Sequence, residues 1–313
     1  MVEISRKLLW WGLAFATATA WAACWYLGMA VGMASGWIGL SMISLIALAI
    51  VRKPTWSPLL RRTLDLLELF FLLLMIGYCG ALLSYVVMSC TSGYTDDLLV
   101  RMDASLGLDW LSIWRAADRH RWIMEAGRIS YTSFFITPLI LLPALVLTGR
   151  SSHAYAFMLA YALCVVLVDV VFAAFPARAA FHHFLSDRPE VWGHGPRDYL
   201  AAIEQLRAGT LRQIEVDRLS GIVTFPSFHA AAGILFIWGA WPLRPLRLPM
   251  LLINSAMLVA ATFFGGHYVV DLFGGIALAY ASVAAITALE RRAARTPDRG
   301  SPQLALEPSF RPA

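Results

Sequence analysis

Charged residues are scarce in this sequence. Aspartate, glutamate, lysine and arginine together make up 14% of the 313 residues, whereas hydrophobic residues make up 59%. A soluble globular domain carries about 25% charged residues, because its surface has to face water. The shortage of charge, together with a mean hydropathy of +0.66, argues against a soluble domain and indicates an integral membrane protein.

The chain also lacks a concentrated basic patch, paired cysteines and internal repeats. Its net charge of +5 comes mostly from arginines spread between apolar runs, a pattern that reflects membrane topology and predicts no nucleic-acid partner. None of the four cysteines has CxxC or paired spacing. Three lie within apolar runs, where ordinary packing is expected, and the role of Cys90, at the end of a run, stays open.

Long apolar runs are what the sequence has in abundance. Eight of them approach or exceed the length that crosses a hydrocarbon core about 30 Å thick, although the second and sixth are short. We therefore predict an all-α, polytopic transmembrane helix bundle embedded in the bilayer. The runs cover residues 8–34, 36–51, 64–89, 130–149, 153–176, 230–243, 248–266 and 270–289.

Basic residues between the runs set the expected orientation. Every short loop on the side of the N-terminus is basic, and the first loop on the opposite side is uncharged. The positive-inside rule then puts both termini in the cytoplasm. The long loops 91–129 and 177–229 fall outside, so we expect a bacterial inner-membrane protein whose site opens to the periplasm. The basic residues are Arg6, Lys7, Arg52, Lys53, Arg61, Arg62, Arg150, Arg244, Arg247, Arg291, Arg292 and Arg295.

Two polar stretches stand out against this background. Residues 224–230 (TFPSFHA) enter the sixth run, and residues 265–271 (GGHYVVD) enter the eighth. Both fall on the outer side, so the histidines within them can meet at one site.

The second stretch holds a histidine and an acid four residues apart, His267 and Asp271. On a helical first turn they share a face, where the carboxylate accepts from one ring nitrogen and leaves the other free. This arrangement suits a nucleophilic or basic histidine, and His229 across the site could protonate a leaving oxygen. The alternative is that each histidine caps or packs at an interface, which the cost of ionisable groups in a membrane makes less favourable.

The two stretches resemble the second and third signatures of the type 2 phosphatidic acid phosphatase superfamily, written PSGH and SRx5Hx3D. The similarity is closer to its phosphotransferase branch, which includes inositol phosphorylceramide synthase and the sphingomyelin synthases. Members of that branch show FPSxHA and HYxxD, as this chain does at 225–230 and 267–271. In layout the resemblance covers 63–290 as a six-span catalytic core. It leaves 1–62 as a two-span extension, and 291–313 as a tail that we expect to be disordered.

The resemblance implies a metal-independent lipid phosphatase or head-group phosphotransferase, with no cofactor, that passes through a phosphohistidine. His267 would attack phosphorus, Asp271 would hold its tautomer, and His229 would protonate the departing alcohol. Ser227 would bind phosphate oxygens, and Tyr268 would be a further substrate contact. The substrate would be a lipid phosphate or phospholipid, and a polyol or lipid alcohol would be the acceptor in a transfer reaction.

Several positions depart from the superfamily's signatures. Ala261 stands where the third signature has Arg, Phe228 where the second has Gly, and Phe181 where the first has Lys. Other arginines, whose forked donors suit phosphate, are therefore the candidates for pairing with the phosphate charge, although solvated loop arginines or contacts to lipid head groups are an equally good interpretation. The candidates, in order, are Arg178, Arg188 and Arg212.

The outer loops carry two further helical patterns. Residues 96–123 mix acids, arginines and tryptophans as an amphipathic helix on the outer leaflet does, either guiding substrate or forming a structural lid. Residues 197–218 have helical apolar spacing at Leu200, Ile203 and Leu206, which predicts a short surface helix beside the site.

Other polar residues allow more than one interpretation. Asp65 and Glu68 can pair with nearby arginines at the interface. Asp169 lies in an apolar run near its outer end and is a candidate for supporting the site indirectly. The adjacent His182 and His183 lack the helical spacing of metal ligands, so we predict no metal site.

A second function class would use the same polar residues. In a transporter or flippase of a lipid or anionic substrate, the histidines would form a proton or substrate relay at mid-membrane. Histidines at the ends of runs, and no pair of interrupted runs in the sequence, favour the enzyme.

Overall fold

The structure, a computed structural model, describes residues 2–32, 55–188, 194–215 and 219–295. Most of this part of the chain is helical, and its one sheet pairs two strands of two residues each. The helices are α1 (Val2–Tyr26), α3 (Pro58–Cys90), α4 (Asp96–Ser105), α5 (Trp110–Asp118), α6 (Arg121–Leu147), α7 (Ser151–Ala174), α8 (Ala180–Leu185), α9 (His194–Arg207), α10 (Phe228–Ala240), α11 (Arg244–Phe263) and α12 (Val269–Arg295); the strands are β1 (Ala30–Val31) and β2 (Gln213–Ile214).

Six of the described helices are long and apolar enough to cross a membrane: α1, α3, α6, α7, α11 and α12. The predicted all-α, polytopic membrane bundle is therefore confirmed. The sixth predicted run forms α10, which has only 13 residues and is about 20 Å long at 1.5 Å per residue. The second predicted run, 36–51, and most of the expected tail lie outside the described residues.

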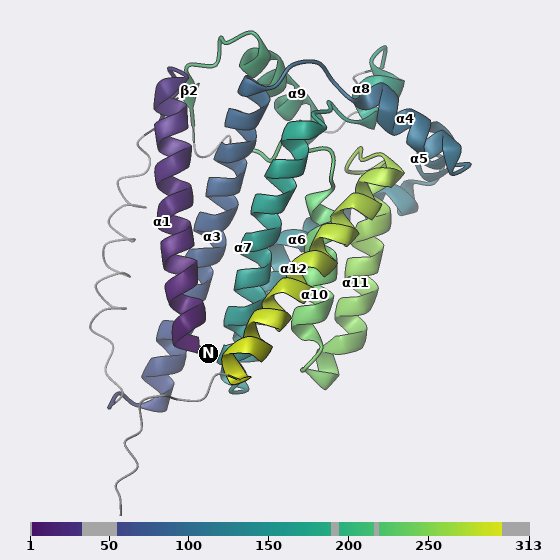
Figure 1. The fold of residues 1–313 in the computed structure, drawn as a ribbon. Coiled ribbons are helices and arrows are strands. Elements are labelled where there is room, and N and C mark those ends of the chain that lie inside the picture. The colour runs from purple at the N-terminus through teal and green to yellow at the C-terminus, as the bar shows by residue number, and fades with distance from the viewer. Residues whose placement is uncertain (1, 33–54, 189–193, 216–218, 296–313) are drawn as a thin grey trace, which may run out of the picture.

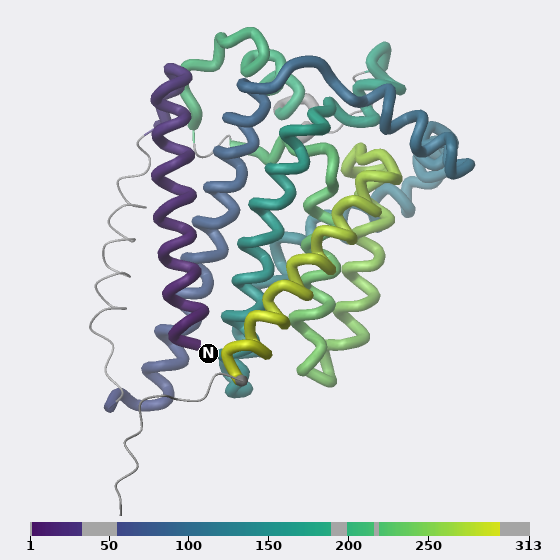
Figure 2. Tube along the Cα trace, viewed as in Figure 1, coloured from purple at the N-terminus to yellow at the C-terminus, as the bar shows by residue number. Residues whose placement is uncertain are grey.

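The long helices stand side by side, and α12 crosses the bundle obliquely (Figures 1 and 2). The short helix α10 packs against α6, α7, α11 and α12. The short helices α4, α5, α8 and α9 gather at one end of the bundle, whereas the start of α1 and the last turns of α12 lie at the other end (Figure 1). The first turns of α10 and α12 therefore face the end that the short helices cover.

Helix α1 is joined to the rest of the bundle at both of its ends. Near its C-terminal end, β1 pairs in parallel with β2 of the long loop before α10. Near its N-terminal end, Arg6 Nε donates to both carboxylate oxygens of Glu68 at 2.9 Å, and Trp10 Nε1 donates to the same carboxylate at 2.8 Å. Tyr155 Oη on α7 also donates to Glu68 at 2.9 Å. This buried carboxylate therefore connects α1, α3 and α7.

The segment predicted as one amphipathic helix over 96–123 is instead two short helices followed by the start of α6. The prediction was wrong because Gly107 adopts a left-handed backbone with φ of 73° and ends the first helix. Trp110 and Trp114 of α5 are buried, so the aromatic face packs onto protein. The helix predicted within 197–218 is present as α9, which ends at Arg207, and Leu200, Ile203 and Leu206 form its buried face. The rest of that range is not helical where it is described, because residues 213–214 form β2.

Candidate active site

The two polar stretches meet where α10 and α12 begin. Ser227 is the N-cap of α10, and its Oγ accepts from the backbone N–H of Ala230 at 3.3 Å. The backbone N–H of Ser227 donates to the carbonyl oxygen of Asp271 at 2.9 Å. A Cβ atom at Gly275 would lie 2.1 Å from the carbonyl oxygen of Ser227, so only glycine allows this approach. These contacts fix the start of α10 against α12.

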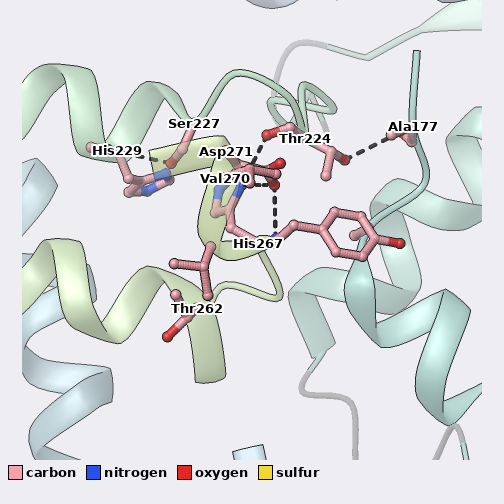
Figure 3. Close-up of polar contacts among 12 residues, drawn as sticks. Ala177, Thr224, Ser227, His229, Thr262, His267, Val270 and Asp271 are labelled. Carbon is pink, nitrogen blue, oxygen red and sulfur yellow. Dashed lines mark hydrogen bonds and ion pairs between the residues drawn. The ribbon is translucent and has the colours of Figure 1, made fainter. Parts of the chain in front are cut away.

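His267 lies in the loop immediately before α12, not on the helical turn that we predicted. Its ring is nearly buried, and its Nδ1 lies 2.9 Å from the carbonyl oxygen of Thr224 and 3.3 Å from Oδ2 of Asp271 (Figure 3). A backbone carbonyl can only accept a hydrogen bond, so Nδ1 carries the proton. The lone pair of the neutral ring is therefore on Nε2.

Asp271 is fully buried in the first turn of α12. Its Oδ2 accepts from the backbone N–H of Tyr268 at 2.8 Å as well as from His267. We predicted that Asp271 alone orients His267, whereas the carbonyl of Thr224 is the closer acceptor. Thr224 is itself held by a hydrogen bond from its Oγ1 to the carbonyl of Ala177 at 3.2 Å (Figure 3).

His229 lies in the first turn of α10 and is held by a tyrosine that the sequence did not predict. The ring of Tyr131, on α6, stacks on the imidazole with centroids 4.0 Å apart and an interplanar angle of 18°. Its Oη lies 3.2 Å from His229 Nδ1. Phe134 packs on the same imidazole at a centroid distance of 4.8 Å. The hydrogen bond at Nδ1 leaves Nε2 of His229 for other partners.

The two histidines line one cavity and their ring centroids are 6.1 Å apart. The cavity has a volume of about 890 Å³ and lies between α3, α6, α7 and the chain that leads into α10. Its walls are mostly apolar. Leu74 and Phe135 line it and are also largely exposed on the outside of the bundle, so the cavity reaches the membrane-facing surface between α3 and α6.

The short helices α4 and α5 hold the loop that carries His267. Asp103 accepts from the backbone N–H groups of Val269 and Val270 at 2.9 and 2.8 Å, which caps α12. Trp110 Nε1 donates to the carbonyl oxygen of His267 at 3.0 Å. Burial raises the pKa of Asp103, and these two backbone donors lower it. The segment expected to guide substrate or to form a lid therefore fixes the loop that carries His267.

A second acid on α4, Asp96, also accepts hydrogen bonds from residues near the site. Asp96 accepts from the phenol of Tyr268 at 2.9 Å and from the backbone N–H groups of Arg178 and Ala179. Asp96 and Asp103 are seven residues apart, which puts them on one face two helical turns apart. That spacing was the available sequence signal for this role.

Comparison with known proteins decides the family. A model of the PAP2 superfamily matches residues 97–285, which is more than half of the chain and includes both histidines and Asp271. The chain belongs to the PAP2 superfamily. Neither the curated proteins nor the solved structures contain a match to it.

The PAP2 signature positions that depart from the pattern have local structural roles here. Ala261, in the arginine position, is fully buried, and its carbonyl accepts from the backbone N–H of His267 at 3.0 Å. Phe228, in the glycine position, lines the cavity and packs edge-on against Tyr161. Phe181, in the lysine position, packs edge-on against Trp110.

Of the five predicted substrate contacts, none is among the residues that line the cavity. The hydroxyl of Ser227 is used as the helix cap, and Tyr268 is fully buried with its phenol on Asp96. Burial and the Asp96 carboxylate raise the pKa of Tyr268. Arg188 is exposed after α8, and the exposed Arg212 lies next to Gly28 at the end of α1.

Arg178 lies in the connection between α7 and α8. Its guanidinium stacks over the ring of Tyr94 at 4.4 Å, and its Nη1 lies 3.3 Å from His182 Nε2. Arg207 of α9 lies over the same tyrosine ring at 4.8 Å. Burial lowers the pKa of His182, and the positive charge of Arg178 lowers it further. Two guanidinium groups are thus gathered around Tyr94, and Ala179, the residue after Arg178, lines the cavity.

Proposed function

We propose that this PAP2 protein is a membrane phosphatase or phosphotransferase for lipid phosphates, with Nε2 of His267 as the nucleophile. The observation that carries the proposal is the bond from His267 Nδ1 to the carbonyl of Thr224 at 2.9 Å. It fixes the tautomer whose Nε2 lone pair is available to attack phosphorus. Membership of the superfamily supports the same class of chemistry.

In the first step, Nε2 of His267 forms a bond to phosphorus, and the bond from phosphorus to the alcohol oxygen of the lipid breaks. The alcohol oxygen takes its proton from Nε2 of the protonated His229, whose Nδ1 stays on Tyr131. The phosphorylated His267 keeps its Nδ1 proton, and Asp271 together with the Thr224 carbonyl stabilises the positive ring.

In the second step, water or an acceptor alcohol attacks the same phosphorus. His229, now neutral, removes the proton from the attacking oxygen, and the bond from phosphorus to Nε2 of His267 breaks. Phosphatase and phosphotransferase therefore share every residue and differ only in the molecule that attacks. The form of the two motifs and Phe228 lean towards transfer, with a polyol or a lipid alcohol as acceptor.

The walls of the cavity support a lipid substrate. Apolar side chains of α3, α6 and α7 line most of it, and it reaches the membrane-facing surface beside Leu74 and Phe135. A lipid phosphate can place its acyl chains among these side chains and its phosphate between His229 and His267. Arg178 and Arg207 supply positive potential at the outer end, which favours an anionic head group.

The basic short loops support an orientation with the start of α1 and the end of α12 in the cytoplasm. These ends lie together, opposite α4, α5, α8 and α9 (Figure 1). The site would then open to the outer leaflet, on the periplasmic side of a bacterial inner membrane. We also propose that 1–62 is an extension, that 63–290 is the catalytic core and that 291–313 is a cytoplasmic tail.

The direct test is an activity screen with detergent-purified protein. Lipid phosphates and phospholipids are supplied with and without myo-inositol or a ceramide, and both free phosphate and lipid products are measured. We expect release or transfer of phosphate that His267→Ala abolishes. A correctly folded protein that acts on none of these substrates would contradict the proposal.

A further inference from the structure

Asp169 is a buried acid that the proposed chemistry does not use. It lies on α7, is 7% exposed and lines the cavity that holds the two histidines. Among the described residues, nothing hydrogen-bonds its Oδ2. An acid inside a membrane protein is costly unless a partner satisfies it. Its position therefore calls for a partner that enters the cavity.

The surroundings of Asp169 leave room for such a partner and supply no cation. Facing it, α3 presents small residues: a Cβ atom at Gly80 would be 3.9 Å from Oδ2, and Gly77, Ala81 and Ser84 line the same wall. The described residues that line the cavity include no lysine or arginine. Besides Asp169, the titratable residues that line the cavity are two histidines and four tyrosines. His229, His267 and Tyr131 already have roles in the proposed mechanism, which leaves Tyr78, Tyr161 and Tyr199.

Two of those tyrosines, like Asp169, have a buried polar atom without a hydrogen-bond partner among the described residues. They are Tyr78 on α3 and Tyr199 on α9, which line the cavity, and the atoms are their hydroxyl oxygens. Three elements that line one otherwise apolar cavity thus carry unpaired polar atoms. A purely hydrocarbon ligand would leave all three unsatisfied, at a cost of about 1–3 kcal/mol for each group. The cavity fits a molecule with polar groups in addition to its phosphate.

We propose that Asp169 is a specificity-determining residue that accepts a hydrogen bond from a free hydroxyl or amino group on the backbone of the lipid phosphate. This assignment rests on the proposed function. The carbonyl oxygen of an acid only accepts, whether the acid is ionised or protonated, so it selects a donor. Monoacyl glycerol phosphates and phosphorylated long-chain amino alcohols carry such donors, whereas diacyl glycerol phosphates do not. A site with a buried polar group discriminates strongly against an analogue that cannot pair with that group.

The test compares two substrates that differ by one donor. One is a 1-acyl-2-hydroxy glycerol phosphate, and the other has the same acyl chain with the hydroxyl replaced by a methoxy group. We expect wild-type kcat/KM to favour the hydroxyl form by about tenfold or more. Asp169→Leu should bring the ratio to about one by slowing the hydroxyl substrate, and Asp169→Asn, which keeps an accepting oxygen, should retain part of the preference. Val170→Leu, at a neighbouring exposed position of α7, should leave the ratio unchanged.

The outcomes separate the two proposals. A wild-type protein that turns over both lipids equally, or an Asp169→Leu variant that keeps the full preference, would overturn the role of Asp169 while the proposed function stands. A folded wild-type protein that turns over neither lipid would contradict the proposed function, and the assignment of Asp169 falls with it. Because the ratio is measured within each variant, a partial loss of folded protein does not change it.

Discussion

The phenol of Tyr131 holds His229 much as Asp271 and the Thr224 carbonyl hold His267. The two rings are stacked 4.0 Å apart, and Tyr131 Oη lies 3.2 Å from His229 Nδ1. Each histidine therefore has its Nδ1 engaged and its Nε2 left for phosphorus chemistry. In the proposed mechanism one of these rings is the nucleophile and the other is the proton donor.

Tyr131→Phe should keep the stacking and remove only the hydrogen bond. We expect kcat to fall by about tenfold or more with KM nearly unchanged, because the proton donor loses its orientation rather than the substrate its binding site. Steady-state kinetics of lipid phosphate turnover check this. The control is Tyr280→Phe, at an exposed position of α12, which should behave as wild type. An unchanged kcat in Tyr131→Phe would remove the tyrosine from the mechanism.

Asp271→Asn should be less severe than loss of the nucleophile. Thr224 still accepts from His267 Nδ1 at 2.9 Å, so we expect kcat to fall by about 10²-fold, against at least about 10⁴-fold for His267→Ala. The comparison needs both variants at equal folded concentration. Equal losses in the two variants would mean that the carboxylate, and not the carbonyl, sets the tautomer.

His229→Ala should depend on the leaving group. An alkyl alcohol needs a proton to leave, whereas an activated phenol leaves as its anion. We expect loss of at least about 10²-fold with a lipid phosphate, and a much smaller loss with an aryl phosphate ester. Rates with the two leaving groups, measured on wild type and variant, check this. If the variant loses the same factor on both esters, His229 is not the proton donor.

Asp103→Ala should weaken the cap of α12. The carboxylate accepts from two backbone N–H groups, and loss of such a cap costs on the order of 1–2 kcal/mol. We expect a lower thermal midpoint together with lower kcat, since the same turn carries His267. Ser57→Ala is the matched control, because Ser57 caps α3 at the end of the bundle opposite the short helices (Figure 1) and should leave kcat unchanged. A drop in stability without any change in kcat would show that the cap does not act on the catalytic loop.

Cys90 gives access to the orientation of the protein. It ends α3 on the side of the short helices, and it is the one exposed cysteine among the described residues. In intact spheroplasts, a maleimide that cannot cross the membrane should label wild-type protein and should not label Cys90→Ser. Labelling that appears only after the membrane is broken would reverse the proposed orientation.

The bundle could be predicted because apolar length is a local property. Seven of the eight expected runs coincide with described helices, and His267 with Asp271 could be found because their spacing is local as well. The break at Gly107 could not, since the surrounding pattern continues through it. Contacts such as Tyr131 with His229 join positions 98 residues apart, so the local sequence around either residue does not reveal them.

Contacts made by backbone groups and the positions of loop arginines could not be predicted from the sequence either. The carbonyl of Thr224 carries no side-chain signal, although it is the closest acceptor to His267. Arg188 and Arg212 were candidate phosphate contacts because forked guanidinium donors suit phosphate; the structure places Arg188 at an exposed position after α8 and Arg212 beside Gly28. The position of a charge in three dimensions depends on how the loop folds. Charge composition says nothing about that.

The most direct test of the account is to trap the covalent intermediate. Protein mixed with a lipid phosphate labelled on phosphorus is quenched within milliseconds and digested, and the modified peptide is identified. We predict a phosphoryl group on Nε2 of His267 that is stable to alkali and lost in acid, that is absent from His267→Ala, and that builds up in His229→Ala with an aryl phosphate ester. Turnover with no labelled protein at any time, or label on another residue, would contradict the central claim.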